Sequence, residues 1–547
     1  MKHNKQQEKQ APVLPIGKEQ IREAARILAK YKAGKANLEG RIVENQEWYK
    51  LRHWDCMRKK KKNEVEPTSA WLFNCIENKH ADAMDQFPLP SVLPREEGDK
   101  AQAKLLSDIL PVILSQNDFE ETYAAVWQDM LIAGTGIYGV FWEPEKAGGM
   151  GDITITAVDP LSIFWEPGVT HLQKSRHLFT VELMDNDLLM DRYPQLEGNL
   201  GQSGVEVGRY LYDDTVDTSH KSPVVDWYYK KQVKGKTVLH YCKFVGETVL
   251  FSSENSYPPQ QGWYNHGEYP FVANPLFPLK GTPAGFGYVD IGKNAQEYID
   301  RGNQAILQNM LFNAKPRHFI VNGGAVNQEE YADTANDFVH VDGTLGQDSV
   351  MPIPPNPLNG IYLDIIHGKI DELKETTGNR DVSTGGTISG VTAASAIAAL
   401  QEAGSKLSRN HIHTAYRAVK RVCLQVVELI RQFYDLPRTF RIMGEQGTQY
   451  LTFENSGLLP TPFEGGEFSG YTQPLFDVEI TVQKQSPYSR LSQNELALQF
   501  FGAGLFNPAI ADQALACLDM MEFDRKSFVE KKIRENAAKA TAFANEK

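Results

Sequence analysis

Three long helical patterns in the second half of the chain constrain its fold most. Apolar residues recur at helical spacing over residues 288–314, over 358–378 and over 393–434. In the third pattern the apolar positions lie alternately three and four residues apart, which indicates a buried seam. That seam consists of Tyr416, Val419, Cys423, Val426, Ile430 and Phe433.

The first two helices each carry one apolar stripe with a polar remainder, and we expect both stripes to be core. The first stripe consists of Ile291, Ala295, Tyr298, Ile299, Ile306, Met310 and Leu311, and the second of Leu358, Ile361, Tyr362, Ile365, Ile366, Ile370 and Leu373. Lys315-Pro316 ends the first helix. A stiff connector with four prolines among residues 352–357 precedes the second helix.

The segment that joins the second and third helices is uncharged. It reads VSTGGTISGVTAASAIAA, from Val382 to Ala399. Its first half consists mainly of Gly, Ser and Thr, which predicts a mobile loop, and its alanine-rich second half predicts the start of the third helix. Composition alone leaves a second interpretation open, in which the loop is a simple linker.

The stretch AGTGIYGV, from Ala133 to Val140, formally matches the dinucleotide-binding pattern G-x-G-x-x-G. A phosphate site of that kind needs the order strand, glycine turn, helix, because the free N–H groups of the helix hold the pyrophosphate. Here a helical pattern comes first and the β-branched and aromatic run IYGVFWEP follows. We therefore interpret Gly134 as a helix C-cap, and Gly136 and Gly139 as points of close packing.

The remaining patterns predict a mixture of helices and strands. We expect helix over 17–60 and 99–133, a mainly β region over 135–280 with one helix near DNDLLMDRYPQL, and strands at RTFRIMG, QYLTFEN and FDVEITVQ. Helices are expected at 489–504, 507–519 and 523–538. The first 16 residues and residues 541–547 are expected to be disordered.

Composition limits the class of protein. A chain of 547 residues is longer than a single compact core normally accommodates, so we expect several domains. Its content of 41% hydrophobic and 23% charged residues is ordinary for a folded protein. A net charge of −12 argues against a general nucleic-acid coat, although a local DNA contact stays possible. The basic run from Arg58 to Lys62 has two interpretations, a solvated loop or a patch for nucleic acid or an acidic partner. No apolar run is long enough to predict a membrane span.

The common motifs that carry chemistry do not occur in the sequence. The chain lacks a phosphate loop, the zinc-protease pattern H-E-x-x-H and the nucleophile pattern G-x-S-x-G. The five cysteines form no C-x-x-C pair, and His411 and His413 point apart on their helix, so neither set predicts a metal site. We expect no catalytic residue, no metal and no cofactor.

The order of the parts resembles the portal protein of tailed bacteriophages. The resemblance is carried by AGTGIYGVFWEP, DITITAVDPLSIFWEP, GYVDIGKNAQEYIDRGNQAILQN and GGTISGVTAASAIAALQEAGSKLSRNHI. It implies an α+β portal fold with a mixed wing, a two-helix stem, a small α/β clip, a long wing helix and a helical crown, assembled as a ring.

The resemblance also assigns the segments. It implies a wing over 17–285 and 437–486, stem helices over 286–315 and 358–381, a clip over 316–357, a tunnel loop over 382–392, a long wing helix over 393–436 and crown helices over 487–540. The tunnel loop that lines the DNA channel would consist of Ser383, Thr384, Gly385, Gly386, Thr387, Ile388, Ser389 and Gly390. The clip docking surface would include Arg317, His318, Asn327, Glu329, Glu330 and Asp333.

The implied partners follow from that role. They are eleven further copies in a dodecameric ring, double-stranded DNA bound without sequence specificity, the large terminase subunit, head–tail adaptor and tail proteins, and the major capsid and scaffolding proteins. The implied location is the portal vertex of the virion, and the host cytoplasm during assembly.

An uncharged loop suits a channel through which DNA slides, because each basic contact to phosphate would add affinity and slow sliding. Two alternatives are another ring-forming virion connector and a nucleic-acid-processing enzyme with an unrecognised site.

Overall fold

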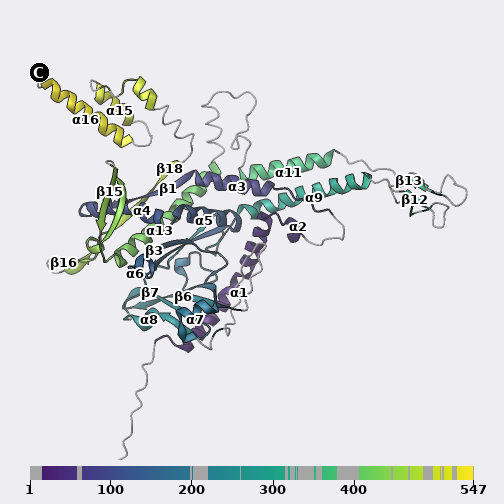
Figure 1. Cartoon of the computed structure of the whole chain (residues 1–547), viewed down its shortest axis with the longest axis horizontal. Helices are drawn as coiled ribbons and strands as arrows, with labels where there is room; N and C mark the ends of the chain where they lie inside the picture. Colours follow the sequence, from purple (N-terminus) through teal and green to yellow (C-terminus); the bar gives the residue numbers. More distant parts are fainter. Residues whose placement is uncertain are drawn as a thin grey trace, which may run out of the picture. The chain divides into compact units, whose positions relative to one another are not determined.

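The chain forms two compact units in the computed structural model, and Figure 1 gives the order of their elements. The larger unit comprises Met1–Asp82 and Pro90–Ile480, and the smaller comprises Ala83–Leu89 and Thr481–Lys547. The structure describes residues 15–57, 65–196, 200, 220–258, 260–314, 318–320, 327, 329–330, 340, 350–352, 360–378, 406–444, 447–465, 468–484, 497–505, 507, 510–519 and 526–545. Among these residues no helix has the length and apolar character needed to cross a bilayer.

The N-terminal helical region is divided more finely than the periodicity predicts. Helix α1 spans Lys18–Tyr49, α2 spans His53–Cys56 and α3 spans Trp71–Met84. The expected helix over 17–60 ends at Tyr49, because Leu51 adopts a left-handed φ of 63° that an α-helix does not tolerate. The expectation of disorder up to residue 16 is wrong for Ile16, which is buried and whose backbone N–H and C=O both bond the Asn255 side chain.

A second helical pair leads into the glycine-rich stretch. Helix α4 spans Lys100–Gln116 and α5 spans Phe119–Ala133, separated by Asp118 with φ 47°. Gly134 follows as the C-cap with φ 83°, and strand β2 begins directly after it as Thr135–Glu143. A Cβ at Gly134 would lie 2.4 Å from the backbone of Phe286, and one at Gly136 would lie 2.3 Å from the carbonyl oxygen of Val126. The predicted order of helix, glycine and strand is confirmed, and it excludes a dinucleotide turn.

Two antiparallel sheets fill the predicted β region. Strands β3 (Asp152–Ala157), β2 and β9 (Phe271–Pro275) form the first sheet in that order. The second has the order β4-β5-β6-β7-β8, with bounds Ile163–Trp165, His177–Asp185, Lys221–Val233, Lys236–Val245 and Thr248–Ser252. Short helices α6 (Lys146–Gly149), α7 (Asn186–Arg192) and α8 (Ser253–Ser256) interrupt the strands, and α7 is the one predicted near DNDLLMDRYPQL.

Helix α1 covers the five-stranded sheet. The apolar face of α1, including Leu28 and Tyr31, packs against aromatic residues of the strands such as Phe179 and Trp227. Lys35 on the same helix is 6% exposed, and its ammonium donates to the carbonyl oxygens of Pro160 and Ile163. This burial lowers the pKa of Lys35 to about 8.

Helix α13, Lys406–Phe433, contains the predicted seam. Val419, Cys423 and Val426 are fully buried, and the helix packs against strands β2 and β9. Its last turn is held by aromatic stacking, because the ring of Phe433 lies 4.6 Å from that of Trp142 at an angle of 5°. Residues 393–405, which were expected to begin this helix, lie outside the described residues.

The strands after α13 pair in three two-stranded ladders. β14 (Arg438–Gly444) pairs with β15 (Gly447–Phe453), β16 (Thr461–Gly465) with β17 (Phe468–Thr472), and β18 (Phe476–Lys484) with β1 (Gln86–Pro94). The strands predicted at RTFRIMG, QYLTFEN and FDVEITVQ correspond to β14, β15 and β18. Strands β1, β16 and β17 were not predicted.

The smaller unit contains helices α15 (Ala511–Asp519) and α16 (Lys526–Asn545). Their common core consists of Phe500, Ala511, Leu518 and Ile533. Two of the three expected C-terminal helices are thereby confirmed, and residues 497–502 supply the described part of the third. The expectation of disorder over 541–547 is wrong as far as Asn545, where α16 ends.

Candidate functional site: a helical hairpin and its buried anchor

Two of the long predicted helices form a hairpin within the larger unit. Helix α9 spans Tyr288–Ala314 and α11 spans Ile361–Thr377, and they lie side by side in Figure 1. Before α9 the chain forms a small ladder of β10 (Phe277–Pro278) with β11 (Gly285–Phe286). Beyond α9 strand β12 (His318–Ile320) pairs antiparallel with β13 (Val350–Pro352). The β12–β13 ladder therefore brings the two ends of the excursion between the helices together.

Two glycines allow the helices of the hairpin to approach closely. A Cβ at Gly302 would lie 2.8 Å from Cγ1 of Ile366, and one at Gly292 would lie 2.9 Å from Cδ1 of Leu373. Both distances are shorter than a carbon–carbon contact of about 3.5–4.0 Å, so a larger residue would push α11 away. Ile366 and Leu373 are accordingly 8% and 1% exposed.

Ala295 and Ile299 of the first stripe are also buried, but several other stripe residues are exposed, which corrects the expectation that both whole stripes are core. Tyr298 on α9 is 55% exposed, and Ile361 and Ile365 on α11 are 54% and 52% exposed. Met310, Leu311, Tyr362 and Leu363 are also exposed. The physical reason is that a two-helix hairpin can bury only the strip of each helix that faces the other, whereas these stripes are wider than that strip.

The exposed residues of α11 continue onto α9. Ile361, Ile365 and Lys369 are four residues apart and so share one face of α11. The ammonium of Lys369 lies 5.2 Å from the ring centre of Tyr298, and it also pairs with Glu372 at 2.6 Å. We call the surface formed by Tyr298, Ile361, Tyr362 and Ile365 the hairpin apolar face.

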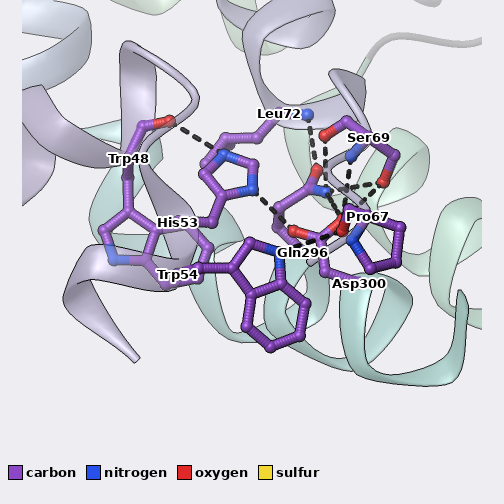
Figure 2. A network of polar contacts seen from close by, with 8 residues as sticks. All are labelled: Trp48, His53, Trp54, Pro67, Ser69, Leu72, Gln296 and Asp300. Carbon is purple, nitrogen blue, oxygen red and sulfur yellow. Dashed lines mark hydrogen bonds and ion pairs between the residues drawn. The ribbon is translucent and has the colours of Figure 1, made fainter. Parts of the chain in front are cut away.

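The base of α9 is held by a buried polar network, drawn in Figure 2. One carboxylate oxygen of Asp300 accepts from the backbone N–H of Ser69 at 3.0 Å, from its hydroxyl at 2.7 Å and from the Gln296 amide at 3.0 Å. The other carboxylate oxygen lies 2.6 Å from Nδ1 of His53. Four polar contacts thus surround this one buried carboxyl group and satisfy both of its oxygens.

Both ring nitrogens of His53 face acceptors. Nδ1 faces the Asp300 carboxylate, and Nε2 lies 3.0 Å from the carbonyl oxygen of Trp48. The ring is therefore held at both nitrogens, by a side-chain acceptor on one side and a backbone acceptor on the other. His53 and Asp300 have no exposed side-chain surface, and the His53 ring also stacks on the Trp48 indole at 4.7 Å. The geometry is that of a fully buried His–Asp pair joined by a short hydrogen bond.

Further bonds extend this network, which we call the anchor and define as Trp48, His53, Ser69, Gln296 and Asp300. Gln296 accepts from the backbone N–H of Leu72 at 2.9 Å and donates to the carbonyl oxygen of Ser69 at 2.8 Å. Figure 2 shows that these partners come from separate segments: the end of α1, helix α2, the stretch before α3, and α9. The anchor therefore ties the first half of α9 to the N-terminal helices.

The anchor contains the residue types of a hydrolytic triad without its geometry. Ser69 donates its hydroxyl to Asp300 and not to His53, and the nitrogen of His53 that would activate a nucleophile bonds the Trp48 carbonyl instead. Because His53 and Asp300 are inaccessible to solvent, the arrangement can stabilise packing but cannot reach a substrate.

The sequence-predicted site residues are only partly described. The predicted tunnel loop, Ser383 to Gly390, lies outside the described residues, as do Arg317 and Asp333 of the predicted clip surface. His318 belongs to β12, and Asn327 and Glu329 are exposed. Both sets of residues therefore stay predictions.

Glu330 of the predicted clip surface has a described partner. Its carboxylate accepts from the backbone N–H of His340 at 2.6 Å and lies 2.9 Å from Nδ1 of the same residue. These bonds hold the pKa of Glu330 below its ordinary value. The contact links two points of the excursion that are ten residues apart in the sequence.

Sequence reasoning missed the anchor. One signal was available, because Gln296 and Asp300 are polar residues next to the apolar positions Ala295 and Ile299 of the same stripe. Polar groups that border a buried stripe need partners, but the sequence does not say which residues supply them. The part of the chain that the structure describes contains no cluster of three or more potential metal ligands.

Comparison with known families identifies the chain. The family model of the phage P22-like portal protein matches residues 85–547, which is most of the chain and includes both helices of the hairpin. Comparison with curated proteins finds no match. The order of elements, the mixed α/β composition and the family match agree with one another. The chain therefore belongs to the P22-like family of phage portal proteins, the head–tail connectors through which DNA is packaged.

Proposed function

We propose that copies of this chain close into a ring at one vertex of the capsid and that double-stranded DNA passes through the ring during packaging and ejection. The ring docks the large terminase subunit first and the adaptor and tail proteins later, and its wing contacts the capsid and scaffolding proteins. Its role is structural and non-catalytic. The family match over residues 85–547 supports this role.

The exposure of the hairpin apolar face is the structural observation that most supports assembly into a ring. Ile361 and Ile365 are more than half exposed on α11, and Tyr298, whose ring lies beside Lys369 of the same α11 face, is exposed on α9. Fully burying one such side chain stabilises an interface by about 1.5–3 kcal/mol, so this surface favours a covering partner. In a ring, the neighbouring copy supplies that cover through the same contact repeated around the axis.

The segments receive their roles from this arrangement. Helices α9 and α11 form the stem, the excursion 316–357 forms the clip, and the docking surface for motor and adaptor includes Asn327, Glu329 and Glu330. The uncharged loop 382–392 lines the channel, where the absence of basic residues keeps DNA free to slide. Helix α13 belongs to the wing, and the smaller unit, with α15 and α16, forms the crown.

Particle mass and negative-stain images of the purified chain test the proposal. We expect rings with a central hole for the wild type. Replacing Ile365→Asp places a charge on the hairpin apolar face, so we expect monomers or small oligomers with an unchanged circular dichroism spectrum. Leu188→Asp is the matched control, because Leu188 is 60% exposed on α7 outside the hairpin, and it should keep the rings.

Two results would contradict the proposal. A wild-type chain that stays monomeric under all conditions of salt and concentration would exclude the ring. Intact rings of the Ile365→Asp variant would show that the hairpin apolar face is not the contact between copies.

A further inference from the structure

The outer face of α13 is basic. From Lys406 to Val427 the sequence contains no Asp or Glu, although the whole chain has a net charge of −12. Arg409, His413, Arg417 and Arg421 are exposed on this helix, while the opposite face is the buried apolar seam. Because these four residues follow one another at intervals of four, they lie on one side of the helix. We call them the α13 basic strip.

Two acidic groups, Asp477 on β18 and Glu428 on α13, are bound by arginines outside the strip. Asp477 on β18 is close enough to Lys420 for the lysine charge to help lower its pKa, but its carboxylate is bound by both nitrogens of an Arg95 fork at 2.9 and 3.1 Å. Glu428, the first acid after the strip, pairs with Arg431 at 2.6 Å. The positive charge of the strip is therefore not cancelled by these two carboxylates.

The spacing of the strip suits a repeating anion. A rise of 1.5 Å per residue separates positions four residues apart by about 6 Å along the helix, a distance comparable with that between neighbouring phosphates of one DNA strand. Three of the four residues are arginines, whose planar guanidinium binds phosphate through two hydrogen bonds. An extended row of such groups fits a charged backbone better than it fits a single carboxylate.

We propose that the α13 basic strip contacts the phosphate backbone of double-stranded DNA. The proposal rests on the proposed function, which brings DNA to the ring, and it adds a contact surface of opposite character to the uncharged loop 382–392. The loop lets DNA slide, whereas the strip holds it by charge. The competing occupant is an acidic surface of a second copy of this chain, and the test below separates the two.

The test measures binding of a mixed-sequence DNA duplex to the full-length protein by fluorescence anisotropy over a series of salt concentrations. We compare the wild type with Arg417→Gln/Arg421→Gln, which removes two charges from the strip. The matched control is Arg26→Gln/Lys30→Gln, which removes two exposed charges from α1. Arg417→Lys/Arg421→Lys keeps the charge and serves as the rescue variant.

The proposal predicts a specific pattern. The slope of log affinity against log salt should fall by about one for each phosphate that the protein no longer neutralises. The glutamine variant should therefore show a slope smaller by about two and an affinity at least about tenfold weaker at low salt. The control should stay within about twofold of the wild type, and the lysine variant should retain most of the slope, because the slope counts charges.

Three results would overturn the proposal: no binding of the wild type at low salt, equal loss in the glutamine and control variants, or disassembly of rings by the glutamine variant. The last result would assign the strip to an interface between copies. Particle mass, recorded on every sample, keeps this test separate from the proposed function. If the wild type forms rings and the glutamine variant binds DNA as tightly as the wild type, the strip is not a DNA contact. The proposal that the chain forms a ring is then unaffected.

Discussion

The hairpin and helix α13 have similar sequence patterns and different surroundings. In α13 the apolar seam is buried by the chain itself, and Val419, Cys423 and Val426 have no exposed surface. In the hairpin Ile361 and Ile365 are more than half exposed. The comparison teaches that an apolar stripe predicts a face that needs cover but does not say whether that cover comes from the same chain or from another copy.

The largest expected effect comes from charging the seam of α13. Val426→Asp buries an unpaired carboxylate in a fully buried position, which costs more than about 4 kcal/mol and should prevent stable folding. Soluble yield and circular dichroism of this variant should therefore fall sharply. Ile365→Asp should leave the soluble yield and the circular dichroism unchanged. If the two variants lose yield and helical signal equally, the difference in burial between α13 and the hairpin is refuted.

Substitutions in the anchor should lower the stability of the fold, as in the buried seam of α13 and unlike in the exposed part of the hairpin. His53→Phe removes the partner of the fully buried Asp300 carboxyl group, and breaking a buried pair of this kind should lower the free energy of unfolding by about 3–5 kcal/mol. Ser69→Ala removes one bond of the same carboxylate and should cost only about 1–2 kcal/mol. Thermal melts of the unassembled chain measure both effects. A decrease below about 1 kcal/mol for His53→Phe would show that the His53–Asp300 pair does not hold α9.

An intermediate effect is expected where the two helices of the hairpin touch. Gly302→Val places atoms within the space occupied by Ile366, and overpacking of this kind costs about 1–3 kcal/mol. Gly368 on α11 is the control, because a Cβ there meets nothing within 4 Å. Gly368→Ala should stabilise the helix by up to about 1 kcal/mol, so melts that move in the same direction for both variants would contradict close packing at Gly302.

The smallest effect concerns Lys35, a charge buried by its own chain. The pKa of Lys35 is about 8 in the fold, below the ordinary value of 10.5. Between these values the unfolded chain binds the proton and the folded chain does not, so stability should rise with pH through this window. We expect a gain of about 1 kcal/mol between pH 8 and pH 9 relative to Lys35→Met, which has no such group. Parallel pH curves for wild type and variant would refute the lowered pKa.

Much of the secondary structure could be predicted from local patterns. The apolar periodicity of α9 and α13, the strands around Gly139 and the C-cap at Gly134 depend on neighbouring residues, so the sequence contains the information that determines them. The breaks at Leu51 and Asp118 could not be predicted, because only their backbone conformation distinguishes them from ordinary helical positions. Strand β1 was missed since its ladder partner, β18, is almost four hundred residues away in the chain.

The candidate site likewise has parts that the sequence predicted and parts that it did not. The positions of the two hairpin helices were predicted, whereas the anchor was not, because Asp300 meets His53 and Ser69 only after α9 packs against the N-terminal helices. The assignments of residues 382–392 and of the clip docking surface come from the family resemblance and stay predictions.

The sequence by itself determined where the long helices lie, which stripe of each is apolar, and that the glycine stretch after α5 is no cofactor turn, because these properties depend on spacing and order along the chain. The tertiary structure decided which stripes the chain covers for itself, which buried charges find partners, and that the basic side of α13 faces solvent. These outcomes depend on packing between segments far apart in the sequence, and burial is a property of such packing rather than of any residue alone.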